Sequence, residues 1–231
     1  MGALLEAIDV VRDYTVRDVV TRALDHLSLR VASGEFTVLA GPSGCGKTTL
    51  LNLLGTLDAP SQGEVRIEGV DPATLPEAAR SRLRLEKLGF VFQAYNLIPV
   101  LSACENVEFV LLLQGVGARE RRERARAVLC ELGLEALLDK RPPEMSGGEQ
   151  QRVAVARAVA SDPRIVLADE PTANLDSHTA DALLDLMAGM NAERGVTFLF
   201  STHDPRVVRR ARRVVHLRDG QIERDDETGE G

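Results

Sequence analysis

The first ninety residues alternate between short apolar runs and polar turns. Gly and Ser separate the runs, which is the spacing expected of β-strands. The predicted strands span residues 7–14, 24–31, 36–40, 65–67 and 88–92. The apolar run at residues 50–57 follows a glycine-rich segment and is predicted to be a helix. This part of the chain therefore combines strands with a helix, as α/β proteins do.

The pattern becomes helical from about residue 94 to residue 160. Apolar positions recur at helical spacing over residues 105–114, 118–132 and 148–160. A Pro-Pro pair at residues 142–143 interrupts the chain before the third of these predicted helices. We therefore expect a mostly helical insertion at residues 94–160.

Strands and helices alternate again after Pro163. Residues 165–168 form a continuous apolar run, which is typical of a strand buried in a parallel sheet. Predicted elements follow at residues 177–194 (helix), 197–201 (strand), 205–211 (short helix), 214–217 (strand) and 221–223 (strand). Asp219-Gly220 between the last two strands is a strong hairpin signal. Residues 225–231 are predicted to be a frayed acidic tail.

These elements predict a single α/β domain spanning residues 1–231. Its core would comprise residues 1–93 and 161–224, with the helical insertion between them and a flexible tail at 225–231. The chain is 44% hydrophobic, which is ample for one buried core of this size.

Charge and cysteine content narrow the functional class. The net charge of −7 argues against a protein that coats nucleic acid nonspecifically. No apolar run is long enough to cross a bilayer, and the first residues lack the features of a signal peptide. The three cysteines are scattered without metal-ligand spacing. We expect a cytoplasmic protein whose membrane role, if it has one, comes through a partner.

The sequence GPSGCGKT at residues 41–48 matches the phosphate-loop pattern G-x-x-x-x-G-K-[ST] in full. It follows an apolar strand and opens an apolar helix, which favours nucleotide binding over an incidental glycine-rich turn. Lys47 is expected to reach the β- and γ-phosphates, and Thr48 to place its hydroxyl on Mg²⁺. Cys45 is either a small filler, which we favour, or a thiol activated by the helix end. The predicted phosphate-binding residues are Gly41, Ser43, Gly44, Cys45, Gly46, Lys47, Thr48 and Thr49.

Two carboxylates follow the buried strand at residues 165–168. Asp169 is placed to orient the Mg²⁺ shell, and Glu170 is the candidate that polarises the attacking water. An ordinary acidic turn is the alternative, which becomes weaker downstream of a full phosphate loop. His203 also ends an apolar strand, where a lone histidine is more often structural than catalytic. We favour a functional role, because we expect His203 at the same edge of the sheet, near the γ-phosphate or the water.

The sequence MSGGEQQ at residues 145–151 opens the third predicted helix of the insertion. Ser-Gly-Gly at a helix start exposes unpaired N–H groups and can seat an anion. Taken alone, the stretch predicts only a capped helix start.

The motifs together resemble the nucleotide-binding subunit of an ABC transporter, and the resemblance covers residues 14–222. The motifs stand in the family's order: residues 41–48, Phe92-Gln93, residues 145–150, Asp169-Glu170, Asn174-Leu175-Asp176 and His203. The resemblance implies a P-loop NTPase core of the RecA type, an N-terminal antiparallel β subdomain and an inserted helical subdomain. It also implies ATP and Mg²⁺ as cofactors.

The family implies a role for each matching position. Tyr14 would stack on adenine, although a surface tyrosine is a serious alternative. Gln93 would touch Mg²⁺ or water and relay the nucleotide state to a membrane partner; the alternative is a polar residue that closes a strand. Asp176 would cross a dimer interface, or cap a helix, or do both. The catalytic set would be Lys47, Gln93, Glu170 and His203, and the metal set Thr48, Gln93 and Asp169, the last through water.

The resemblance also implies a head-to-tail homodimer in which each nucleotide lies between one phosphate loop and the other chain's Ser-Gly-Gly. The residues that would reach the nucleotide of the partner are Ser146, Gly147, Gly148 and Gln150. In this arrangement the Ser-Gly-Gly segment binds the nucleotide of the partner. That explains why the chain has a second candidate anion-binding segment far from its own phosphate loop.

Residues 96–101, 105–107 and 141–144 are most similar to one branch of the family. That branch comprises lipoprotein-release and macrolide-export ATPases and the related cell-division ATPase. It implies integral-membrane permease subunits as partners and a position on the inner face of the cell membrane. Met145 stands where Leu is usual, and Ala173 where Gly is common.

The alternatives are a cell-division or other signalling complex, a soluble ABC ATPase acting on ribosomes or DNA, and a non-hydrolysing scaffold. No nucleic acid is expected, because glutamates interleave the arginines at residues 119–126, which is typical of a solvated helix face. An intact set of Lys47, Glu170 and His203 argues against a scaffold with a dead site.

Overall fold

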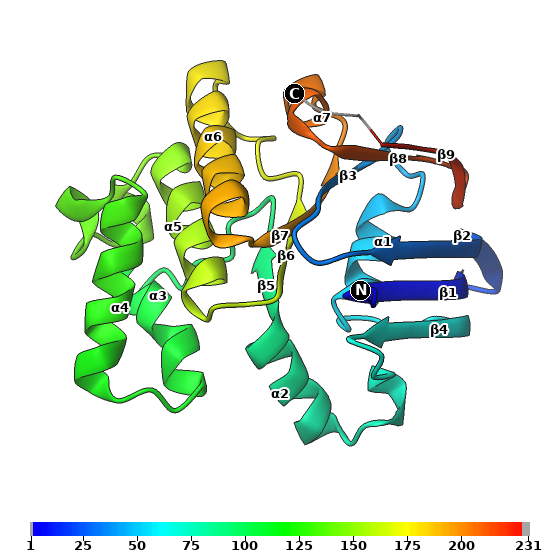
Figure 1. Cartoon of the computed structure of the whole chain (residues 1–231), viewed down its shortest axis with the longest axis horizontal. Helices are drawn as coiled ribbons and strands as arrows, with labels where there is room; N and C mark the ends of the chain where they lie inside the picture. Colours follow the sequence, from blue (N-terminus) through cyan, green and yellow to red (C-terminus); the bar gives the residue numbers. More distant parts are fainter. Residues whose placement is uncertain (1, 228–231) are drawn as a thin grey trace.

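The computed structural model describes residues 2–227, which contain a six-stranded sheet at the centre of the molecule (Figure 1). The strand order is β5-β6-β7-β3-β8-β9, with β5 through β8 parallel and β9 antiparallel to β8. The strands are β3 (Phe36–Ala40), β5 (Leu88–Val91), β6 (Ile165–Asp169), β7 (Thr197–Thr202), β8 (Arg213–Arg218) and β9 (Gln221–Glu227). A mixed α/β fold of this kind confirms the predicted fold class.

The central strands bury both faces, because their side chains alternate between two apolar layers. Phe198 and Phe200 pack with Phe36 on one face, where the Phe36 and Phe200 rings are 4.6 Å apart between centroids. Leu199 and Leu39 point to the other face. Helices α5 (Gly147–Ala160) and α6 (Ser177–Arg194) cover the first face, and α1 (Lys47–Leu54) covers the second.

A second, antiparallel sheet packs beyond α1 and has the strand order β2-β1-β4. Its strands are β1 (Leu5–Val16), β2 (Val19–Val31) and β4 (Gln62–Ile67). The β1–β2 hairpin is longer than predicted and turns at Arg17 and Asp18, which both have positive φ. Its outer end bears exposed Val16, Val19 and Val20, so burial does not mark these positions as strand. This sheet is the N-terminal antiparallel subdomain that we predicted.

Three helices gather beside the central sheet: α3 (Ala103–Leu113), α4 (Ala118–Glu131) and α5 (Figure 1). Ser102 caps α3 through a capping box with Glu105. Helix α2 (Glu77–Lys87), which connects β4 to β5 after a short 3₁₀ helix (Pro72–Thr74), has no counterpart in the sequence prediction. The reason is that α2 is short of large apolar residues: Leu83 and Leu85 are the only ones, and both are only half-buried. The remaining short elements are Glu135–Leu137, Pro142–Glu144 and α7 (Pro205–Arg210).

The predicted acidic tail is wrong for residues 225–227, which belong to β9. Arg213 on β8 holds Asp225 through two hydrogen bonds of 2.8 and 2.9 Å, and the same guanidinium contacts Glu35 at 2.9 Å. The hydrogen bonds from Arg213 lower the pKa of Asp225, so the acidic side chain stabilises the strand end as an ion pair. Residues 228–231 of the predicted tail lie outside the described residues. No helix in the described part of the chain is long and apolar enough to span a bilayer.

Candidate functional site

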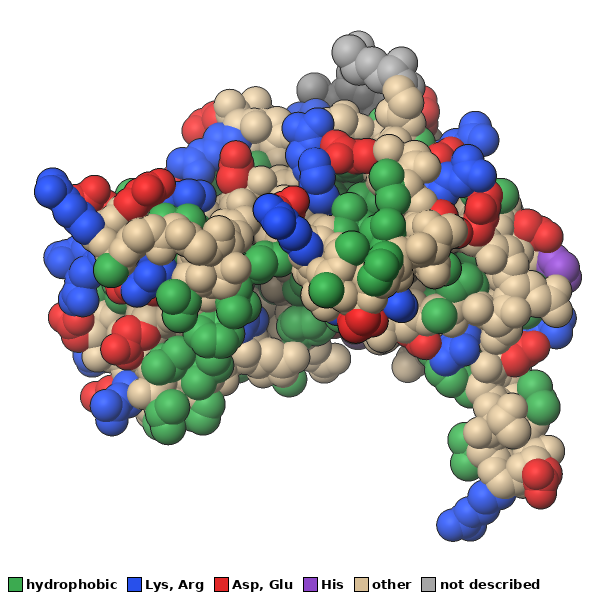
Figure 2. All heavy atoms as spheres, turned by 90° about the horizontal axis from the view of Figure 1, so that it is seen from below, with side chains coloured by type: hydrophobic (Ala, Val, Ile, Leu, Met, Phe, Trp, Pro, Cys, Tyr) green, Lys and Arg blue, Asp and Glu red, His purple; other side chains and the backbone are tan. Residues whose placement is uncertain are grey.

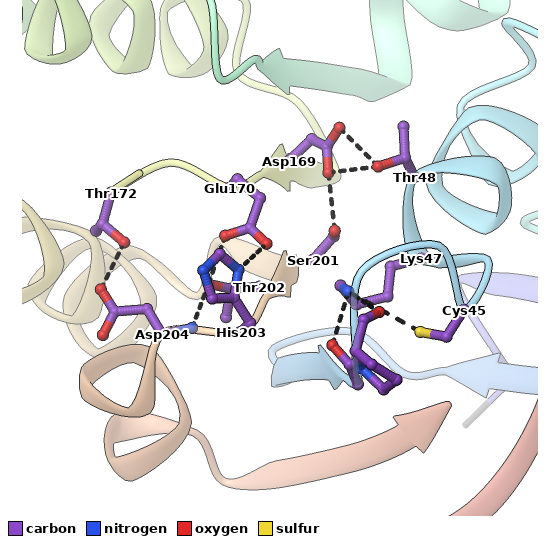
Figure 3. Close-up of polar contacts among 12 residues, drawn as sticks. Cys45, Lys47, Thr48, Asp169, Glu170, Thr172, Ser201, Thr202, His203 and Asp204 are labelled. Atoms are coloured by element: carbon purple, nitrogen blue, oxygen red, sulfur yellow. Dashed lines mark hydrogen bonds and ion pairs between the residues drawn. The ribbon is translucent and has the colours of Figure 1, made fainter. Parts of the chain in front are cut away.

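The candidate site lies at the carboxyl ends of three neighbouring strands, β6, β7 and β3. Asp169 at the end of β6 pairs with Ser201 on β7, and Thr202 on β7 pairs with Ala40 at the end of β3. Parallel strands bring their carboxyl ends to one edge of a sheet, where α/β proteins place their ligands. The phosphate loop, the two carboxylates and His203 therefore meet at this edge, as predicted (Figure 3).

The phosphate loop connects β3 to α1, and glycine permits its path. Gly44 and Gly46 have φ values of 80° and 106°, which side chains other than glycine rarely adopt. A Cβ atom on Gly46 would also lie 2.6 Å from the carbonyl oxygen of Ala23 on β2. Helix α1 begins at Lys47, three residues earlier than predicted, because the loop itself leads directly into the first turn.

The Lys47 side chain folds back over the loop. Its ammonium donates hydrogen bonds to the carbonyl oxygens of Gly41 at 2.8 Å and Pro42 at 2.9 Å (Figure 3). Only 7% of Lys47 is exposed, so the positive charge is held inside the loop. Cys45 is 3% exposed, which agrees with its interpretation as a small filler.

A pocket of about 550 Å³ opens over the loop. The predicted residues that line it are Ser43, Gly44, Gly46, Lys47, Thr48, Thr49, Gln93, Glu170 and His203. Gly41, Cys45 and Asp169 lie beside the pocket rather than in its wall. Among the described residues, the walls include none of Tyr14, Ser146, Gly147, Gly148, Gln150 or Asp176. One chain thus brings the phosphate-binding and catalytic candidates together and leaves the predicted partner-directed residues elsewhere.

The donor set around Thr48 fits Mg²⁺. The Thr48 hydroxyl lies 3.1 Å from both oxygens of Asp169, and the Ser201 hydroxyl donates to Asp169 Oδ1 at 2.8 Å. Hydroxyl and carboxylate oxygens are ligands that Mg²⁺ prefers, usually together with water and substrate phosphates. Residues 2–227 contain no group of three or more His, Cys, Asp or Glu side chains that could hold a metal ion without such additional ligands.

Glu170 is fixed at both of its carboxylate oxygens. The Nδ1 atom of His203 lies 2.7 Å from Oε1, and the hydroxyl of Thr202 donates to Oε2 at 2.9 Å (Figure 3). The Glu170 side chain is 14% exposed, whereas that of His203 is 73% exposed. Glu170 has a positive φ of 45°, an uncommon conformation for a residue with a side chain. The arrangement holds a carboxylate at the pocket wall, where it can orient a water molecule and accept its proton.

Residues behind His203 hold this strand end in place, and the sequence analysis missed them. Asp204 accepts hydrogen bonds from Thr172 at 2.9 Å and from the Arg206 guanidinium at 2.7 Å. Burial alone would raise the pKa of Asp204, but the hydrogen bonds from Arg206 and Thr172 outweigh it and lower the pKa to about 2. The signal available in the sequence was the polar run that follows the apolar strand at residues 197–201.

The loop after β5 places Gln93 in the pocket wall. Side chains from two other segments donate hydrogen bonds to the backbone of this loop. The Asn174 amide donates to the carbonyl of Gln93 at 2.9 Å. Arg157 on α5 donates to the carbonyls of Tyr95, at 2.9 Å, and Asn96. Burial lowers the pKa of Arg157, and the contacts with these two carbonyls satisfy part of its guanidinium. Arg157 was not singled out in the sequence, where it looks like any other polar residue of an amphipathic helix.

The Ser-Gly-Gly segment forms the capped helix start that its sequence predicts. Glu149 donates its N–H to the Ser146 hydroxyl at 3.3 Å, and the Glu149 carboxylate accepts the N–H of Ser146 at 2.7 Å. A Cβ atom on Gly148 would lie 2.3 Å from the Thr179 methyl group, so glycine lets α5 approach α6. Ser146 is exposed, and α5 lies on the opposite side of the central sheet from α1 (Figure 1).

Two further predicted residues have local structural roles. Asp176 caps α6 by accepting the N–H of Thr179 at 3.1 Å, which confirms one of its two interpretations. Tyr14 on β1 donates its hydroxyl to Asp58 at 2.9 Å, and the Arg12 guanidinium lies over its ring. The dimer role of Asp176 and the adenine role of Tyr14 remain predictions.

Known proteins resemble this chain over most of its length. It is 48% identical to the lipoprotein-releasing system ATP-binding protein LolD of Anaeromyxobacter dehalogenans, across 96% of this chain and 93% of the relative. It is 46% identical to the macrolide export ATP-binding/permease protein MacB of Syntrophobacter fumaroxidans, across 95% of this chain but 31% of that longer protein.

A solved structure has the same fold. The dimeric structure of the ATP-binding cassette MJ0796 in a post-hydrolysis state, bound to ADP and Pi, matches with a TM-score of 0.92 and 40% identity. The match covers 98% of this chain and all of the solved chain; the protein named MJ0796 comes from Methanocaldococcus jannaschii. The ABC transporter family model matches residues 24–173, which contain the phosphate loop, the Ser-Gly-Gly segment and both carboxylates. The chain belongs to the ABC transporter family.

Proposed function

We propose that this chain is the ATP-binding and ATP-hydrolysing subunit of an ABC transporter. The observation that carries the proposal is the meeting of the phosphate loop, the Thr48–Asp169 pair and the Glu170–His203 pair around one pocket. Relatives that are 46–48% identical are named as ATP-binding proteins of lipoprotein release and macrolide export. A similar solved structure holds ADP and Pi.

Different residues of the pocket bind the phosphates, hold the metal and activate the attacking water. Lys47 and the loop N–H groups bind the phosphates, and Thr48, Gln93 and Asp169 would hold Mg²⁺, Asp169 through water. When bound, the metal supplies positive charge beside the transferred phosphoryl group. Glu170 orients the attacking water and accepts its proton, while Thr202 and His203 fix the carboxylate. The exposed His203 can also reach the γ-phosphate from the same wall.

The site becomes complete when two chains pair head to tail. Ser146, Gly147, Gly148 and Gln150 lie away from the pocket of their own chain, and Ser146 is exposed at a helix N-terminus that suits a phosphate. The similar solved structures are dimers. We propose that these residues contact the γ-phosphate held by the partner and that Asp176 lies at the interface.

A second surface supports a membrane partner. Figure 2 shows apolar side chains gathered on one face of the molecule, which is hollowed between the helical insertion and the core. A groove of about 1110 Å³ runs there between α2, β5 and α3. On α3, Phe109, Leu112 and Leu113 are 40%, 50% and 58% exposed. We propose that a short apolar segment of an integral-membrane permease docks in this groove and holds the chain at the inner face of the cell membrane.

The groove also suggests how hydrolysis and transport communicate. Arg157 lines the groove and binds the loop that carries Gln93 to the pocket. Residues 94–160 would act as a helical subdomain that moves against a core made of residues 1–93 and 161–224. The cargo, lipoprotein or macrolide-like, would be selected by the permease.

The test is Glu170→Gln, which keeps the size of the side chain but removes its charge. We expect ATP hydrolysis to fall by about 100-fold or more, the usual effect of losing a positioned acid–base group. ATP should then trap a dimer that gel filtration resolves from the monomer. Glu193→Gln, at an exposed position of α6, is the matched control and should hydrolyse ATP normally. A Glu170→Gln variant that stays monomeric at saturating ATP would contradict the proposal.

A further inference from the structure

Arg12 and Tyr14 on β1 form a closed cluster with Asp58 in the segment after α1. Arg12 binds Asp58 through two hydrogen bonds, at 2.9 Å from Nε and 2.8 Å from Nη2. The Tyr14 hydroxyl donates to the same carboxylate at 2.9 Å. The Arg12 guanidinium also lies 4.5 Å from the centroid of the Tyr14 ring. Each member of the cluster therefore contacts the other two.

The cluster lies on the face of the β1–β2 hairpin that borders the pocket. Arg12 pairs with Leu24 across the hairpin, so these two side chains share one face, and the Leu24 side chain lies 2.8 Å from the position of a Cβ atom on Gly46 in the phosphate loop. Ala23 lines the pocket over the phosphate loop, and its carbonyl makes the close approach to Gly46. The Tyr14 ring, which Arg12 covers, therefore lies on the face of the hairpin that meets the phosphate loop.

Two contacts fix the orientation of this ring, and an ion pair joins the two residues that make them. The hydroxyl is tied to Asp58, which follows α1, and Arg12 covers one ring face. The Arg12 and Asp58 side chains are only 23% and 25% exposed, so the ion pair is partly shielded from solvent and holds its geometry better than a surface pair. Tyr14 itself remains partly exposed. With one face occupied by the guanidinium, the opposite face is the one on which a planar group can stack.

A ring held in advance binds its ligand better than a mobile one, because the ordering cost is already met. The planar group expected beside a phosphate loop is the base of the nucleotide, and an aromatic side chain stacks on any base. We propose that Arg12 and Asp58 are positioning residues that fix the Tyr14 ring as a platform for the adenine base. The inference rests on the proposed function and extends it from the phosphates to the base.

The alternative is that the cluster only fastens β1 to the segment after α1. The two roles predict different behaviour toward ligands with and without a base. A platform affects the binding of MgADP and leaves the binding of Mg-pyrophosphate unchanged, since pyrophosphate contacts only the loop. A fastening role changes stability, or changes both ligands together.

The experiment measures the affinities of MgADP and Mg-pyrophosphate by isothermal titration calorimetry for the whole chain and its variants. Tyr14→Ala should weaken MgADP by about 10-fold, the effect of losing one stacking contact. Arg12→Met and Asp58→Asn should each weaken MgADP by about 3-fold or more. All three variants should bind Mg-pyrophosphate like the unmodified chain. The double variant Arg12→Met/Tyr14→Ala should be no weaker than Tyr14→Ala alone, because the arginine acts through the ring.

Arg22→Met is the matched control. Arg22 pairs with Asp13 and Asp25 on the same hairpin, with Asp13 one residue from Tyr14 and therefore on the other face of β1. Its loss should leave the affinity for MgADP unchanged. If Arg12→Met fails to fold, Arg12→Lys keeps the charge without the bidentate geometry, and a weakened affinity for MgADP with normal pyrophosphate binding is again expected.

The inference is overturned if Arg12→Met or its lysine substitute, together with Asp58→Asn, binds MgADP like the unmodified chain. It is also overturned if both ligands weaken in proportion. Failure of the proposed function would look different, because the unmodified chain itself would then bind neither MgADP nor Mg-pyrophosphate.

Discussion

The Thr202 hydroxyl donates a 2.9 Å hydrogen bond to Oε2 of Glu170, on the carboxylate oxygen that His203 does not contact. The same hydroxyl oxygen accepts the N–H of Asp204 at 2.9 Å, so its proton is directed toward Glu170. Thr202 is fully buried. The orientation of the candidate base is therefore set by a side chain that does not itself line the pocket.

Thr202→Val should reduce kcat for ATP hydrolysis by about 10-fold and leave KM nearly unchanged, because the hydrogen bond positions Glu170 rather than the nucleotide. Thr202→Ser should restore most of the rate, since it keeps the hydroxyl. Steady-state kinetics of the two variants provide the measurement. Equal loss in the valine and serine variants would show that packing, and not the hydrogen bond, matters at this position.

Arg157→Met should weaken ATP-driven dimerisation, because it frees the loop that carries Gln93 from helix α5, whose N-terminus bears the Ser-Gly-Gly segment. We expect the concentration of ATP needed to form half of the dimer to rise by about 5-fold, the scale of one ordinary hydrogen bond. The measurement uses the Glu170→Gln background and light scattering. Arg124→Met is the control, since Arg124 also binds a main-chain carbonyl, that of Ala160, without touching the loop.

Arg206→Met should lower the free energy of unfolding at neutral pH. It should also make that free energy change less as the pH falls from about 4 to about 2. The pKa of Asp204 is lowered from 3.8 to about 2 in the folded chain, so ionised Asp204 stabilises the fold above pH 3.8. That contribution is lost as the pH falls from about 4 to about 2. Urea unfolding across this range should show the two proteins converging at the acidic end. A constant difference at every pH would contradict the assignment to Asp204.

Gly189→Ala should stabilise the fold by about 0.5 to 1 kcal/mol, because alanine favours a helix interior over glycine. Gly189 lies within α6, and a Cβ atom there would meet nothing within 4 Å. Gly195→Ala should do the opposite, since Gly195 ends the same helix with a φ of 67°. Thermal unfolding of both variants compares the same substitution in two backbone conformations. A destabilised Gly189→Ala would show that the site is less open than the structure indicates.

Much of the site was predictable because it depends on chain direction and strand ends. A strand followed by a phosphate loop, and two other apolar strands that end in Asp169 and His203, leave few ways to arrange a parallel sheet. The contacts that tune the site were not predictable in the same way. Thr202 and Arg157 act through hydrogen bonds between segments 32 and 62 residues apart along the chain, and neither residue type is distinctive on its own.

The fold was predicted best where burial imposes a period on the sequence. Helix α2 was missed because it carries few apolar residues and none that is fully buried, and the outer end of the β1–β2 hairpin was missed because its valines face solvent. The acidic residues at 225–227 were taken for a tail because sequence reasoning assigned Asp225 no partner, whereas the fold brings Arg213 beside it. In each case the missing information was a tertiary contact or its absence.

The separation of the exposed Ser146 from the pocket of its own chain has a genetic consequence. If each pocket is completed by another copy, a chain that folds and pairs but has a defective Ser146 leaves the pocket of its normal partner incomplete. In a cell that makes equal amounts of both chains, random pairing leaves only about a quarter of the dimers with two normal copies. Substitutions at Ser146 that permit folding and pairing would therefore be inherited as dominant traits, whereas those that prevent folding would be recessive.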